Sequence, residues 1–110
     1  MKSPRMKIYA MYSASYELLL NDFFLPSLKN TDLELVTRKI DSVGSGIFGS
    51  ESWSQTMLKK VNFTIEAVQE NFGHIFIVSD VDVQFFRNIS QDITSRLENK
   101  DIVFQSDDYL

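Results

Sequence analysis

The sequence predicts an α/β protein, a three-layer α/β/α sandwich with a mostly parallel sheet. Short apolar segments with β-branched residues alternate along the chain with longer segments whose apolar residues recur every three or four positions. Strands joined by helices pair in parallel, and right-handed crossovers place those helices on the faces of the sheet. The length of 110 residues predicts one domain over residues 1–110.

The first strand and the first helix are expected near the N-terminus. Residues 7–12 are mostly apolar and should form a buried strand. Residues 16–28 carry apolar side chains at helical spacing, and Ser13 or Ser15 should cap that helix with its hydroxyl group. Pro26 lacks an N–H group, so the helix should kink or end one residue earlier.

A second strand, a loop and a long helix come next. Residues 33–40 contain β-branched residues and several polar ones, which indicates a strand nearer an edge of the sheet than the first one. Residues 41–52 form a loop rich in Gly and Ser. Apolar residues then recur at intervals of four or three and predict an amphipathic helix: Trp53, Met57, Val61, Ile65, Val68 and Phe72.

The third predicted strand covers residues 75–78. These residues are apolar, too few and too β-branched for a helix, so we expect a buried, central strand. Ile93 and Leu97 suggest a short helix after it. Residues 101–105 then predict a fourth strand.

Two carboxylates follow the third predicted strand. Asp80 and Asp82 should therefore lie at the carboxyl edge of the sheet, where open α/β folds bind their ligands. Residues two apart on an extended segment point to the same side, and two carboxylates on one side repel each other unless a cation or a proton lies between them. Oxygen ligands of this kind suit Mg²⁺ or Mn²⁺ together with substrate phosphates. A solvated turn after a strand is the alternative interpretation.

Three further features each have two interpretations. Residues 44–49 match G-x-G-x-x-G, but this loop follows the second strand at some distance, so a flexible loop near a ligand is favoured over a dinucleotide fingerprint. Lys59 and Lys60 either reach a diphosphate from the long helix or form a solvated helix face. Asp107 ends the fourth predicted strand, either near Asp80 or as part of a solvated terminal pair.

Composition and charge exclude several classes of function. A net charge of −4 argues against a nucleic-acid partner. The absence of cysteine excludes a disulfide framework, a thiolate metal site and a Cys nucleophile. The basic N-terminal start makes a poor signal peptide, and no apolar run is long enough to span a membrane. We therefore expect a cytoplasmic protein.

Three segments together resemble a known family. Residues 76–86, Phe-Ile-Val-Ser-Asp-Val-Asp-Val-Gln-Phe-Phe, resemble the strand and Ser-Asp-x-Asp motif of nucleotide-diphospho-sugar transferases. Residues 53–60 are similar to the helix of that family in which an aromatic residue precedes a lysine, and residues 101–107 look like its next strand. The resemblance implies a Rossmann-like fold of the GT-A glycosyltransferase type. It also implies that the chain is a truncated, donor-binding half, incomplete at its C-terminus.

The resemblance further implies a site for a nucleotide-diphospho-sugar donor, with an acceptor that the sequence does not identify. Tyr12 and Ser13 would face the nucleoside. Asp80 would lie near the ribose or a metal-bound water, and Asp82 would coordinate Mn²⁺ or Mg²⁺ bridging the diphosphate. The implied nucleotide-sugar site consists of Tyr12, Ser13, Lys59, Lys60, Asp80, Asp82 and Asp107.

Two other classes of protein stay open from the sequence. Phosphohydrolases of the haloacid-dehalogenase type also carry Asp-x-Asp after an apolar strand, but their motif favours Thr or Val where Gln84 stands. A non-catalytic binding domain that keeps the fold is the other alternative. An unpaired sheet edge would favour a homo-oligomer in that case.

Overall fold

A parallel sheet forms the middle layer of the protein. The computed structural model describes residues 5–41 and 49–105. Within these ranges the sheet has three strands in the order β2-β1-β3, and β1 pairs in parallel with both neighbours. The strands are β1 (Lys7–Ser13), β2 (Glu34–Ile40) and β3 (Phe76–Ser79).

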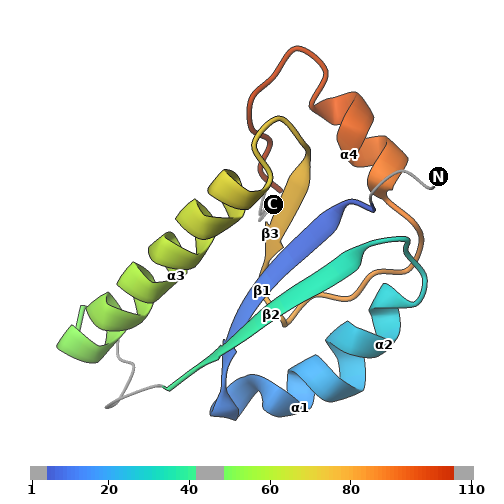
Figure 1. The fold of residues 1–110 in the computed structure, drawn as a ribbon. Helices are drawn as coiled ribbons and strands as arrows, with labels where there is room; N and C mark the ends of the chain where they lie inside the picture. The colour runs from blue at the N-terminus through green and yellow to red at the C-terminus, as the bar shows by residue number, and fades with distance from the viewer. Residues whose placement is uncertain (1–4, 42–48, 106–110) are drawn as a thin grey trace, which may run out of the picture.

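Helices cover both faces of this sheet (Figure 1). A continuous helical segment follows β1 on one face, and the long α3 lies on the other face, which confirms the predicted α/β/α layers. The helical elements are η1 (Ala14–Tyr16), α1 (Glu17–Leu19), η2 (Leu20–Phe24), α2 (Leu25–Leu28), α3 (Glu51–Glu70) and α4 (Ser90–Arg96).

The central strand β1 is buried on both of its faces. Ile8 and Ala10 are inaccessible to solvent on one side, and Tyr9 and Met11 are buried on the other. Successive side chains of a strand point to opposite faces, so β1 supplies the middle of two separate hydrophobic clusters. The first cluster joins β1 to the helical segment and to the chain after β3: Ile8, Ala10, Leu20, Phe24, Leu28, Leu33 and Val81.

The second cluster holds α3 against the sheet. Phe63 and Ala67, one turn apart on α3, pack against Tyr9, Met11 and Ile40. The ring of Tyr9 makes an edge contact with that of Phe63, with 5.7 Å between ring centroids. These contacts fix the rotation of α3 about its own axis, and with it the direction of every side chain on the helix.

The hydroxyl group of Tyr9 lies in a small buried polar network. It donates to Glu70 Oε2 at 2.8 Å and accepts from Asn71 Nδ2 at 2.7 Å. A buried tyrosine needs such partners because its hydroxyl group has lost its water. Burial, followed by the hydrogen bond to Glu70, raises the pKa of Tyr9 above its ordinary value of 10.0.

The apolar stripe predicted for α3 is not the face that the helix buries. Phe72 is 87% exposed and Val61 is 53% exposed, and Ile65 and Val68 are also exposed. The buried face carries Phe63 and Ala67 instead. Apolar residues stand on opposite sides of this helix, and the aromatic contact with Tyr9 decides which side faces the sheet.

Two expectations for the first helical segment need correction. The segment does not end at Pro26: helical structure continues to Leu28, and the wider π-helical turn of η2 comes immediately before the proline and accommodates its ring. Neither Ser13 nor Ser15 caps the segment through its hydroxyl group. The Oγ atoms of these two serines lie 3.0 Å apart and hydrogen-bond to each other.

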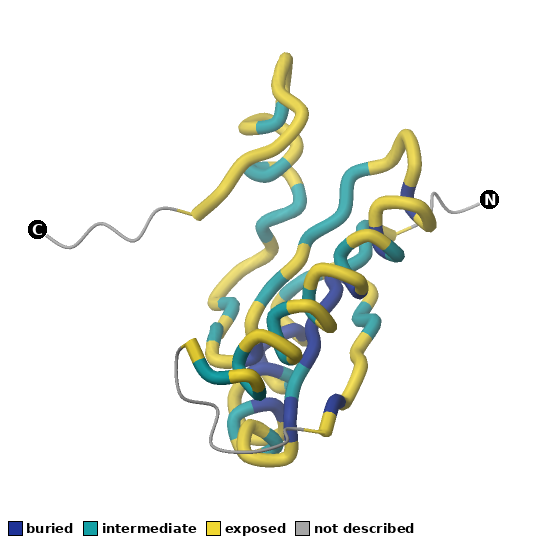
Figure 2. The backbone as a smooth tube through the Cα atoms, turned by 90° about the vertical axis from the view of Figure 1, so that its left-hand side faces the viewer, coloured by how far each residue is buried: buried dark blue, intermediate teal, exposed yellow. Residues whose placement is uncertain are grey.

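Two expectations for the C-terminal part are also wrong. The strand predicted at residues 75–78 forms as β3, but it stands at an edge of the described sheet and Val78 is 48% exposed. Residues 101–105 form no strand and are exposed. Figure 2 shows this segment running away from the body of the protein. The expected self-association through a free sheet edge stays a prediction.

Replacing Tyr9 by Phe tests the buried polar network. We expect Tyr9→Phe to lower the free energy of unfolding by about 1 kcal/mol, the usual net value of a lost hydrogen bond. Because the pKa of Tyr9 is raised on folding, its stabilisation is present below pH 10.0 and is lost as the pH rises through the folded-state pKa. Denaturant titrations from pH 7 to 11 should show this loss in the wild type and less of it in the variant.

The matched control is Tyr16→Phe, which removes the hydroxyl group of an exposed tyrosine. Its effect should stay within about 0.5 kcal/mol. Equal destabilisation by the two substitutions would contradict the role given to the Tyr9 network.

Candidate functional site

A pocket lies at the carboxyl edge of the sheet, between the ends of β1 and β3. Its volume is about 510 Å³. The chain leaves β1 toward β2 on one side and returns through α3 to β3 on the other, so the strand order reverses between β1 and β3. Open α/β folds bind their ligands in the crevice at such a reversal.

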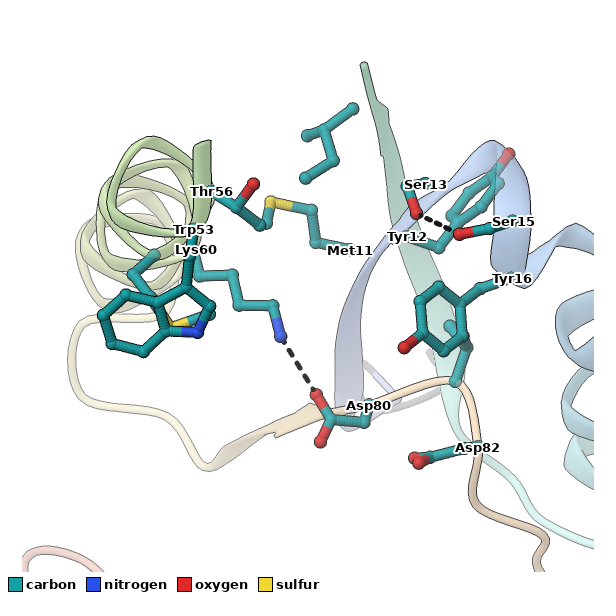
Figure 3. Close-up of a pocket in the computed structure, with 13 residues that line it drawn as sticks. Met11, Tyr12, Ser13, Ser15, Tyr16, Trp53, Thr56, Lys60, Asp80 and Asp82 are labelled. Atoms are coloured by element: carbon teal, nitrogen blue, oxygen red, sulfur yellow. Dashed lines mark hydrogen bonds and ion pairs between the residues drawn. The ribbon is translucent and has the colours of Figure 1, made fainter. Parts of the chain in front are cut away.

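The two predicted acids lie in this pocket. Asp80 and Asp82 are exposed, whereas Val81 between them is 4% exposed and belongs to the core on the side of the helical segment. Burial of the valine leaves the two carboxylates outside the core, and Figure 3 shows both projecting from the chain after β3. The sequence therefore predicted correctly that the acids stand at this edge.

Lys60 and Lys59 separate in space although they are adjacent in the sequence. Lys60 Nζ lies 3.6 Å from Asp80 Oδ1, and its side chain lines the pocket (Figure 3). Lys59 instead lines a second hollow beside Asp41 and Glu66. The sequence alone does not distinguish the two lysines as ligands of a diphosphate. In the structure only Lys60 lies beside the acids.

The opposite wall of the pocket comes from the end of β1. Tyr12 and Ser13 line it, as do Ser15 and Tyr16 in the turn that follows. The hydrogen bond between the serine hydroxyl groups ties this turn to the strand end. Figure 3 shows the hydroxyl group of Tyr16 pointing toward the acids, whereas that of Tyr12 points away from them.

Sequence reasoning missed several residues of the pocket. Trp53, Thr56 and Met57 of α3 line it together with Lys60. Their spacing could have predicted this, because residues three, four and seven positions before Lys60 lie on the same side of a helix as Lys60. The periodicity instead predicts Trp53 as part of the apolar stripe of an amphipathic helix. The N-cap of α3, where Ser50 Oγ accepts from the Trp53 N–H at 3.2 Å, fixes where this wall begins.

Two predicted features fall outside the residues that the structure describes. Asp107 belongs to residues 106–110, and most of the loop at residues 44–49 belongs to residues 42–48. Gly49, the last residue of that loop, is described and has a φ of +82°, a conformation that glycine adopts without strain.

The carboxylate oxygens in the pocket are suitable ligands for a divalent cation that also binds an anionic ligand. Over residues 5–41 and 49–105, no three His, Cys, Asp or Glu side chains lie together as a complete metal cage. The pocket supplies the two carboxylates of Asp80 and Asp82. Mg²⁺ is commonly held by one or two carboxylates, with substrate phosphates and waters filling the other positions.

These observations define the chain as an open α/β protein with a pocket where the order of parallel strands reverses. The family model of the nucleotide-diphospho-sugar transferases matches residues 15–110, and the chain belongs to that family. This match confirms the resemblance drawn from the three sequence segments. Neither a curated protein nor a solved structure matches the chain. No helix in the described ranges has the length and apolar character needed to cross a membrane.

The role of Val81 as the anchor of the acids is testable by truncation. We expect Val81→Ala to lower the free energy of unfolding by about 2 kcal/mol, because it removes two buried methyl groups and leaves a cavity. Urea denaturation measures this loss. Val78→Ala removes the same atoms from a half-exposed position of β3 and should cost clearly less. Similar costs at the two positions would show that Val81 is no anchor.

Proposed function

We propose that the chain is the donor-binding domain of a glycosyltransferase, which binds a nucleotide-diphospho-sugar through Mn²⁺ or Mg²⁺ at Asp80 and Asp82. The observation that carries this proposal is the pocket between β1 and β3, where two carboxylates, one ammonium group and a wall of hydroxyl and aromatic groups meet. Membership of the nucleotide-diphospho-sugar transferase family supports it independently.

Asp82 and Asp80 have different surroundings, which suggests different roles. Asp80 is paired with Lys60, whereas the structure records no ion pair for Asp82 among the described residues. We assign direct coordination of the metal to Asp82, and a place near the ribose or a metal-bound water to Asp80. The metal, when bound, neutralises charge on the nucleoside diphosphate that leaves the sugar.

The remaining groups of the pocket suit the other parts of the donor. Tyr12 and Ser13, at the end of β1, would face the nucleoside with an aromatic ring and a hydroxyl group. Lys60, rather than Lys59, would contact the diphosphate, because its ammonium group already lies beside Asp80. Transfer of the sugar to an acceptor, and a cytoplasmic location, complete the proposal.

Titration calorimetry with UDP and GDP, with and without Mn²⁺, tests this function. We expect one of these nucleotides to bind in a Mn²⁺-dependent manner. Asp82→Asn should weaken that binding by more than about tenfold, the lower bound for losing even an outer-shell group of a metal site. Asp92→Asn is the matched control, since Asp92 lies in α4 at the other end of the sheet (Figure 1).

Two results would contradict the proposal. The first is the absence of metal-dependent binding of either nucleotide to the wild-type chain. The second is hydrolysis of a simple phosphate monoester that disappears in Asp80→Asn, which would identify Asp80 as the nucleophile of a phosphohydrolase.

A further inference from the structure

The ion pair between Lys60 and Asp80 neutralises one of the two carboxylates that would attract a metal ion to the pocket. Lys60 Nζ lies 3.6 Å from Asp80 Oδ1, and the side chains of Lys60 and Asp80 are 43% and 71% exposed. Figure 3 shows the lysine reaching across from α3 to the segment after β3. A bare metal ion that approaches Asp80 therefore meets a positive charge already in place.

The charges in the pocket explain why this lysine matters. Asp80 and Asp82 with Lys60 leave an excess of negative charge, which attracts a cation. A divalent ion reverses that sign, so the ammonium group and the metal repel each other until an anion joins them. A diphosphate is such an anion, because it attracts both cations at once.

We propose that Lys60 is a specificity-determining residue that makes the pocket favour a metal–nucleotide complex over the bare metal ion. The proposal rests on the proposed function and assigns a further role to one residue of that site. Lys60 neutralises the charge of Asp80, which would otherwise attract the bare metal ion bound at Asp82 through one of its waters. When the diphosphate arrives, the lysine leaves the carboxylate and pairs with the phosphate oxygens.

The exposure of the ion pair makes this exchange energetically accessible. Exposed ion pairs contribute little free energy, and solvent screens them further, so a competing anion displaces the lysine readily. The ammonium group sits on a flexible four-carbon stem and is free to follow a new partner without movement of α3. Phe63 and Ala67 meanwhile keep the helix in place against the sheet.

The exchange has a thermodynamic signature. If Lys60 disfavours the metal alone and favours the metal with nucleotide, it increases the cooperativity between the two ligands. Cooperativity of binding is reciprocal, so Mn²⁺ should strengthen nucleotide binding by the same factor as the nucleotide strengthens Mn²⁺ binding. Loss of the lysine should reduce that factor and change the two component affinities in opposite directions.

The experiment compares Lys60→Met, Lys60→Arg and Lys59→Met with the wild type. Free Mn²⁺ is measured by electron paramagnetic resonance, and UDP or GDP binding at saturating Mn²⁺ by calorimetry. We expect Lys60→Met to bind Mn²⁺ alone about two- to fivefold more tightly, in line with an exposed ion pair. The same variant should bind the nucleotide with Mn²⁺ about tenfold more weakly, since it loses a charged hydrogen bond to phosphate.

The other variants separate this role from a general effect of charge. Lys60→Arg keeps the positive charge and should keep the cooperativity. Lys59→Met removes the same charge from the neighbouring position, which lines the second hollow, and should leave both affinities unchanged. Far-UV circular dichroism of each variant confirms the fold.

Several outcomes would overturn the inference. It fails if Lys60→Met weakens both affinities, if it changes neither, or if Lys59→Met has the same effect. A different result would contradict the proposed function itself: the wild type would then bind neither UDP nor GDP in the presence of Mn²⁺. The Mn²⁺ titration in the absence of nucleotide still tests whether Lys60 neutralises the charge of Asp80.

Discussion

The rest of the structure depends on the burial of β1 between two strands and two layers of helices. Tyr9 illustrates the effect of this burial. Its ring packs against the aromatic rings of Phe63 and Phe76, and its buried hydroxyl group needs hydrogen-bond partners within the protein. Glu70 and Asn71, at the end of α3, supply them. One polar atom in an apolar layer thus ties the C-terminal end of α3 to the central strand, while Phe63 ties its middle.

The pocket follows from this arrangement. Its wall of serines and tyrosines is the turn where β1 ends, and its acids stand where β3 ends beside β1. Lys60 reaches the acids because Phe63 and Ala67 set the rotation of α3. Each group of the site is therefore held by an element that β1 positions, although β1 itself contributes few of the polar atoms.

Features that depend on local pattern could be predicted from the sequence, and features that depend on a distant partner could not. The layers, the parallel pairing, the edge position of β2 and the place of Asp80 and Asp82 follow from periodicity and residue type. Adjacent helical residues differ in direction by about 100°, so only the buried face of α3 distinguishes Lys60 from Lys59. The apolar residues at 101–105 resemble a strand, but a strand needs a neighbour to accept its hydrogen bonds.

Val81 belongs at once to the core and to the segment that carries the acids. A cation that binds the two carboxylates would also hold this valine in place, because the unfolded chain offers no such arrangement. Binding in the pocket would then be coupled to folding. The free energy of unfolding would increase with the logarithm of the ligand concentration once that concentration exceeds the dissociation constant. The temperature at which the chain unfolds would accordingly rise with the concentration of the proposed ligand.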